Sequence, residues 1–118
     1  MLRRARFVVV LALFGLIAIA PPASAATVVK AVSTTSGFRF KPASVSVAVG
    51  AHVKWKAVIG THTVTAYSSN WHKNTQFTVG DPTGFTFHHA GRYKYRCTFH
   101  SFLTNGVCSG MCGKVVVG

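Results

Sequence analysis

Acidic side chains are almost absent from this chain, and Asp81 is the only Asp or Glu among its 118 residues. Acid–base catalysis by carboxylates usually needs a pair of such groups, and a calcium site needs several oxygen ligands. The chain offers neither arrangement, and nothing else in it suggests a substrate pocket. We therefore do not expect an enzyme.

The first 25 residues have the pattern of a secretory signal peptide. Arg3, Arg4 and Arg6 form a positive head, residues 7–20 are an apolar run of 14, and Ala23-Ser24-Ala25 provides a small-residue cleavage site. The run is too short for a convincing membrane span. We expect an exported protein, whether periplasmic, extracellular or associated with the cell envelope, with a single domain over residues 26–118. Ordinary secretion fits this pattern better than twin-arginine export, which the Arg3-Arg4 pair leaves open.

The balance of charge is strongly basic. Residues 26–118 hold ten of the 13 Lys and Arg residues and the one acid, a formal charge of +9. Such a charge attracts anionic partners, here an acidic redox protein or an anionic envelope surface. Export and the absence of any nucleic-acid-binding motif argue against nucleic acid as a partner. We expect a monomer.

Apolar and polar residues alternate along most of residues 26–118, and no stretch has a sustained helical period. This pattern, with frequent turn signals, predicts an all-β domain of seven to eight short antiparallel strands, a small sandwich or barrel. The segment 68–75 is polar and is predicted to be a loop. The alternating stretches are 44–49, 52–57, 62–67, 85–87, 92–97 and 115–117.

Three parts of the chain supply ligands suited to a soft metal. The segment Cys97-Thr98-Phe99-His100 offers a thiolate and an imidazole three residues apart, on a turn that leaves a strand. His62 lies 35 residues before Cys97 and must arrive from another strand, and Met111 adds a thioether. Two imidazoles, a thiolate and a weak thioether are the ligands of mononuclear copper sites for electron transfer. The sequence therefore predicts one copper ion that cycles between Cu(I) and Cu(II).

The order of motifs resembles the cupredoxins of the plastocyanin and amicyanin type over nearly all of residues 26–118. This resemblance implies a Greek-key β-sandwich in which His62, Cys97, His100 and Met111 bind copper. It also implies a blue-copper protein that carries single electrons between redox partners. The matching segments are Phe38-Arg39-Phe40-Lys41-Pro42, Val45-Ser46-Val47, Val53-Lys54-Trp55, His62-Thr63-Val64, residues 90–100 and residues 110–117.

Two features depart from that family. Ten residues separate His100 from Met111, where the family has only a few, so we predict an insertion within the ligand loop. Leu103 stands where the shortest loops place their methionine, and leucine cannot coordinate a metal. Many relatives have asparagine at the position of Thr63, and the shorter threonine predicts weaker support of the cysteine loop.

The inserted segment carries Cys108 and Cys112, for which three arrangements are open. A disulfide between them suits an oxidising compartment and leaves Cys97 free. Alternatively, both could join Met111 in an extra Cu(I) site, as in a copper carrier or chaperone. A disulfide from Cys97 to either one would abolish the blue site and leave a structural β-sandwich.

The remaining histidines and aromatic residues receive simpler interpretations. We expect His52, His72, His88 and His89 to lie at the surface, since adjacent histidines in a strand point apart. We expect Phe99, Phe102 and Leu103 to form an apolar rim around His100, through which electrons would be exchanged. The aromatic residues expected in the core are Trp55, Phe38, Phe40, Tyr93 and Tyr95.

Overall fold

The computed structural model describes residues 26–118 together with the isolated positions 10, 12 and 15. The predicted signal peptide therefore lies almost wholly outside the described residues. Within them there are nine strands, β1 (Thr27–Thr34), β2 (Gly37–Lys41), β3 (Ser44–Val47), β4 (His52–Ala57), β5 (Thr61–Ala66), β6 (Asn74–Thr78), β7 (Thr83–Thr86), β8 (Gly91–Thr104) and β9 (Val107–Val117). In the described part of the chain there is no helix long and apolar enough to cross a membrane.

The strands form two sheets, in the orders β2-β1-β4-β7 and β3-β9-β8-β5-β6. The pairs β1–β4 and β3–β9 are parallel, so the prediction of purely antiparallel strands is wrong for these two pairs. The other pairs are antiparallel, and the chain both forms hairpins and crosses between the sheets. The predicted all-β sandwich is therefore confirmed, with nine strands rather than seven to eight. The loop predicted over 68–75 is wrong at its end, because β6 begins at Asn74. β6 is an edge strand in which only Phe77 is buried, so its polar residues hide the strand pattern.

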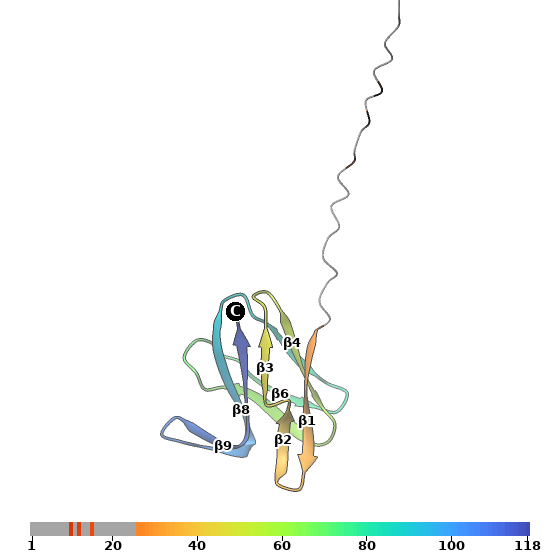
Figure 1. Ribbon diagram of the computed structural model, residues 1–118. Coiled ribbons are helices and arrows are strands. Elements are labelled where there is room, and N and C mark those ends of the chain that lie inside the picture. Colours follow the sequence, from red (N-terminus) through yellow and green to blue (C-terminus); the bar gives the residue numbers. More distant parts are fainter. Residues whose placement is uncertain (1–9, 11, 13–14, 16–25) are drawn as a thin grey trace, which may run out of the picture.

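The last two strands extend beyond the body of the sandwich as a hairpin (Figure 1). We call this extension, residues 101–110, the β8–β9 arm. Its ladder runs from Ser101 opposite Gly110 to Thr104 opposite Val107. Asn105 and Gly106 close it with positive φ values of 49° and 75°, as a two-residue hairpin turn requires. The insertion predicted in the ligand loop is thus a paired hairpin.

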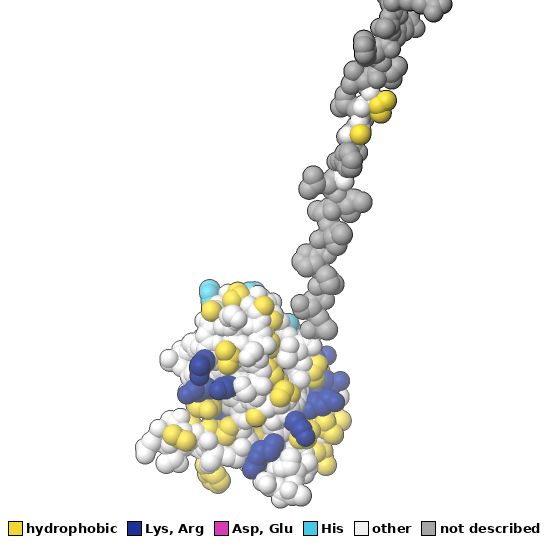
Figure 2. Space-filling view, in the orientation of Figure 1, with side chains coloured by type: hydrophobic (Ala, Val, Ile, Leu, Met, Phe, Trp, Pro, Cys, Tyr) yellow, Lys and Arg dark blue, Asp and Glu magenta, His cyan; other side chains and the backbone are white. Residues whose placement is uncertain are grey.

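Cations spread over the surface, while Asp and Glu are not seen on the side that Figure 2 presents. The charged residues alternate with buried ones along each strand. In β4, for example, Val53 and Trp55 are buried and Lys56 is exposed. Period-two alternation therefore sends the cations outward from both sheets.

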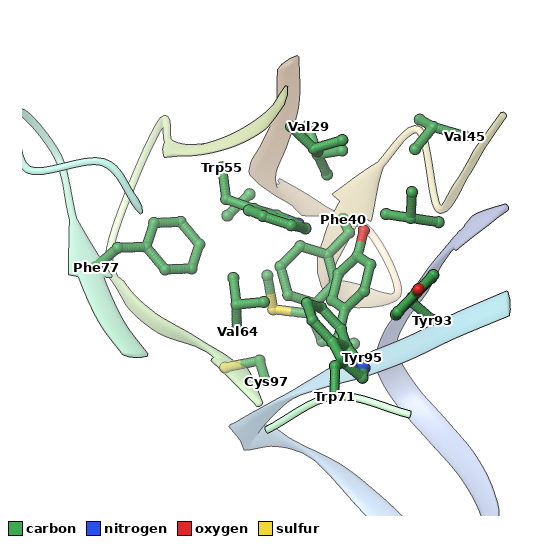
Figure 3. Close-up of a cluster of buried hydrophobic side chains, with 14 of the residues drawn as sticks. Val29, Phe40, Val45, Trp55, Val64, Trp71, Phe77, Tyr93, Tyr95 and Cys97 are labelled. Carbon is green, nitrogen blue, oxygen red and sulfur yellow. The ribbon is translucent and has the colours of Figure 1, made fainter. Parts of the chain in front are cut away.

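Between the sheets lies an aromatic core (Figure 3). Trp55 and Tyr95 are fully buried with their rings edge to face, and Trp71 contacts both of them. Phe40 stacks edge-on against Tyr95 from the other side. The predicted core residues are confirmed except Phe38, which is half-buried and lies at the site described next.

Candidate metal centre

Three of the four predicted ligands come together at one end of the sandwich. The donor atoms of His62, Cys97 and His100 all lie within 4.8 Å of one another. The Cys97 Sγ lies 3.9 Å from His62 Nδ1 and 3.4 Å from His100 Nδ1. One ion placed among them can contact all three, and this is the only such group of His, Cys, Asp and Glu within the described residues.

The four residues Cys97–His100 form a bulge in β8. The β8–β9 register steps from Arg96 opposite Cys112 to Ser101 opposite Gly110, so this segment faces Met111 alone. The Ser101 hydroxyl donates to the Cys97 carbonyl at 2.5 Å and closes the bulge. A bulge re-aims side chains that a regular strand would send to alternate faces. Cys97 and His100 can therefore point toward the same ion.

The position of Met111 follows from the same register. It is fully buried and lies directly across the ladder from the bulge. The residue after it, Cys112, is already back in the regular ladder, and the one before it, Gly110, begins the β8–β9 arm. The ten intervening residues therefore leave Met111 on the last strand beside the site rather than displacing it. Leu103, which stands where the shortest family loops place their methionine, lies in the arm and is 41% exposed.

His62 is held by a backbone contact that the sequence does not reveal. Its Nε2 lies 2.7 Å from the Ile59 carbonyl oxygen, which can only accept a hydrogen bond. The proton is therefore on Nε2, and Nδ1, which faces Cys97, is left with a free lone pair. Such a partner fixes the ring orientation and tautomer of a metal-binding histidine. Because the partner is a main-chain carbonyl, no residue type signals it.

His100 is the more accessible of the two imidazoles. It is partly exposed, whereas His62 is fully buried. Partial burial, and secondarily the nearby His62, lowers the pKa of His100, which keeps its ring neutral and able to bind a metal. Phe38 packs against both rings, with centroid separations of 5.1 Å to His62 and 4.5 Å to His100. The sequence placed Phe38 in the core and missed this contact.

Thr63 supports the cysteine segment more fully than its length suggests. Its backbone N–H points at the Cys97 Sγ at 3.4 Å. Its hydroxyl oxygen accepts a hydrogen bond from the Thr98 backbone N–H at 2.9 Å and another from the Thr65 hydroxyl. Thus β5 is tied to the bulge of β8 at the thiol and at the residue that follows it. The prediction that Thr63 supports the cysteine loop only weakly does not include these hydrogen bonds.

The other cysteines adopt the first of the three predicted arrangements. Cys108 and Cys112 form a disulfide, and Cys97 is a buried free thiol. This excludes the extra soft-metal site and the disulfide through Cys97. The histidines His52, His72, His88 and His89 are exposed, as predicted.

Solved structures of amicyanin share this architecture. The reduced Cu(I) form of a proline-to-glycine variant at pH 4 is 28% identical, covers 81% of this chain and 85% of its own, and gives a TM-score of 0.64. A methionine-to-alanine variant with Cu(I) has 27% identity at the same coverage and TM-score. The reduced state of a proline-to-phenylalanine variant has 29% identity and a TM-score of 0.63. The chain is therefore similar in fold to the amicyanins, which are cupredoxins.

Other comparisons added no relative, since no family model and no curated protein sequence matches the chain. The likeness to cupredoxins therefore depends on the fold together with the His62–Cys97–His100 group. The β8–β9 arm with its disulfide lies between His100 and Met111.

Proposed function

We propose that this protein is an exported electron carrier that holds one copper ion with His62, Cys97, His100 and Met111. The observation that carries the proposal is the convergence of a buried thiol and two imidazoles within 4.8 Å. Thiolate and imidazole favour copper over the hard cations, which prefer oxygen. Copper, when bound, supplies a one-electron change between Cu(I) and Cu(II).

The ligand residues would favour rapid one-electron transfer because the surrounding structure holds their side chains in fixed positions. Cys97 would bind the ion through its sulfur, and the Thr63 N–H aimed at that sulfur helps to hold it in place. His62 presents Nδ1 because the Ile59 carbonyl holds Nε2. Met111, which is fully buried, would supply a weak thioether ligand. A site fixed by packing and hydrogen bonds rearranges little between oxidation states, which lowers the barrier to electron transfer.

His100 is the proposed electron port. Apolar side chains project around it, with Phe99 56% and Phe102 77% exposed. Together with Phe38 and Arg39 they border a groove of about 420 Å³ beside His100. Exposed apolar residues next to charged ones suit a short-lived docking contact with another redox protein. No substrate pocket or acid–base pair accompanies the site, so we propose no enzymatic activity of its own.

The proposal is tested by adding Cu(II) to the purified, metal-free mature protein. We expect an intense blue absorption band and the electron spin resonance spectrum of a thiolate-bound Cu(II) site. The variant Cys97→Ser should lose the blue band, whereas Met111→Leu should keep it with a changed reduction potential. Binding of Cu(II) without a blue colour in the unaltered protein would show that the three side chains do not share the ion as proposed.

A copper carrier that hands over metal rather than electrons is the second candidate. Its additional ligands would have been Cys108 and Cys112, and both are held in the disulfide. Repeated oxidation and reduction separates the two functions, since an electron carrier keeps its copper through many cycles. Progressive loss of copper to a chelator during cycling would favour the carrier.

A further inference from the structure

Nine of the ten Lys and Arg residues in 26–118 divide between the outer faces of the two sheets, and the tenth, Lys73, lies between β5 and β6. In the β2-β1-β4-β7 sheet, the buried residues Val29, Phe40 and Trp55 point inward, and their neighbours along each strand point outward. We call the outward cations of this sheet the lysine face. Its members are Lys30, Arg39, Lys41, Lys54 and Lys56. The opposite sheet carries Arg92, Lys94, Arg96 and Lys114 on β8 and β9, which we call the β8–β9 face.

A row of three lysines crosses the centre of the lysine face. Lys30 on β1 pairs directly with Lys41 on β2 and with Lys56 on β4. Directly paired residues of neighbouring strands project to the same side, and the strands lie about 4.8 Å apart. Like charges placed opposite each other destabilise a sheet. The chain's one acid, Asp81, lies outside β1, β2 and β4, although its neighbours Gly80 and Pro82 line a pocket together with Lys54 and Lys56.

The lysine face lacks the side chains that anchor protein partners. Its one exposed large apolar residue is Val28, at 38%. Aromatic residues usually anchor protein–protein interfaces, and here the exposed ones, Phe99 and Phe102, lie at the metal centre and in the arm instead. A surface rich in cations and poor in exposed aromatic residues is suited to a membrane, because anionic lipid headgroups can move within the bilayer to lie next to the cations.

We propose that the lysine face binds the anionic surface of a lipid bilayer. The cations are spread over three strands rather than along one line, so they match a two-dimensional array of headgroups better than a single polyanionic chain. Each cation near such a surface strengthens binding about fivefold at physiological salt. Five together are enough for reversible attachment without an apolar anchor.

Attachment through this face leaves the metal centre accessible. The β8–β9 arm extends from the body on the side of β8, away from β1 and β4 (Figure 1). Figure 2 shows cations on the side of β1 and β2 and a second group on the side of β8; those by β1 and β2 are well separated from the end of the arm. The bound protein can therefore still present His100 to a redox partner. Only Arg39, which also borders the groove beside His100, connects the two regions.

The test uses metal-free mature protein, so its outcome does not depend on the copper function. Sedimentation with vesicles of zwitterionic phospholipid containing a minor fraction of phosphatidylglycerol measures the partition coefficient. The triple variant Lys30→Gln/Lys41→Gln/Lys56→Gln should bind roughly 100-fold more weakly. The matched control Arg92→Gln/Lys94→Gln/Lys114→Gln removes the same charge from the β8–β9 face and should bind within a few fold of the unaltered protein.

Two results would overturn the proposal. One is no binding of the unaltered protein to anionic vesicles, and binding to soluble polyphosphate in that case would point to a polyanionic chain. The other is an equal loss for the two triple variants, which would mean that net charge rather than this face decides. Thermal unfolding of both variants checks that the fold is retained, which exposed Lys→Gln changes should not disturb.

Discussion

Cys108 and Cys112 are joined by a disulfide that encloses Met111 in a ring of five residues. The two half-cystines occupy different parts of the ladder, since Cys112 pairs with Arg96 on the body of the sheet and Cys108 pairs with Leu103 in the arm. The bond therefore ties the arm to the body across the point where β9 passes the ligand bulge. Met111 lies at that point, so we expect the disulfide to limit its movement.

This restraint can be measured in the absence of metal. Met111 is the only methionine in residues 26–118, and it is fully buried. The change Cys108→Ser/Cys112→Ser should speed oxidation of Met111 by peroxide at least about tenfold, and should lower the free energy of unfolding by about 2 kcal/mol. Mass spectrometry of the peptide containing Met111 measures the rate. The control Ser109→Ala keeps the disulfide and should leave the rate unchanged.

The Thr63 hydroxyl is the second structural support open to a test. Thr63→Val keeps the shape of the side chain but leaves the Thr98 N–H without its partner. The bond is part-buried, and leaving its donor without a partner should cost about 1 kcal/mol or more, which denaturant unfolding should detect. Thr65→Val removes a different bond to the same oxygen and should cost less than about 1 kcal/mol, because the Thr98 N–H stays satisfied. Equal losses for the two variants would contradict a specific role for Thr63.

The sequence was sufficient to predict the parts of the site that depend on side-chain chemistry and on strand alternation. Cys97 and His100 stand out by their spacing, and His62 shares an inward face with Val64, so their convergence follows once the strands are placed. The Asn105-Gly106 pair is a typical hairpin signal, so the arm could have been predicted from the sequence of the insertion. Registers between distant strands, such as Met111 opposite the bulge, depend on tertiary pairing and cannot be obtained from local pattern.

Other elements were hidden for different physical reasons. The Ile59 carbonyl that orients His62 is a main-chain group and has no residue-type signal. Phe38 looked like a core residue because phenylalanine usually is one, and only the packing at the end of the sandwich places it against two imidazoles. The start of β6 is hard to predict because an edge strand needs to bury only one face. In β6 Phe77 is the only buried residue, so the polar residues around it resemble a loop.

Gly110 is required where β9 bends at the site. Its φ is +92°, and a Cβ there would lie 2.6 Å from the His100 carbonyl oxygen. Gly110→Ala should therefore displace the His100 end of the bulge. We expect a loss of more than about 2 kcal/mol of stability and weaker Cu(II) binding, measured by unfolding and by metal titration.

A matched glycine separates backbone strain from this steric contact. Gly106 also has a positive φ, of +75°, but a Cβ there would meet nothing within 4 Å. Gly106→Ala should cost only the conformational strain, roughly 1 kcal/mol, with Cu(II) affinity unchanged. If both variants lose the same stability and bind copper equally, the close approach of Gly110 to His100 is not important for the site.

Repulsion within the lysine row should be measurable without any partner. Lys30 faces a lysine on each side, and like charges directly opposite oppose pairing by about 0.2–1 kcal/mol each. Lys30→Gln should therefore raise the melting temperature at low salt. The gain should disappear near 1 M salt, where the Debye length falls to about 3 Å.

Lys54 provides the control for that experiment, because its directly opposed residues are Val28 and Gly84 rather than cations. Lys54→Gln removes the same charge from the same face, so a general effect of net charge would raise both melting temperatures equally. A larger, salt-sensitive gain for Lys30→Gln would show that the row itself is strained. A row that persists at a cost to the isolated domain is what binding to an anionic surface would explain, since the headgroups would supply the missing counter-charges.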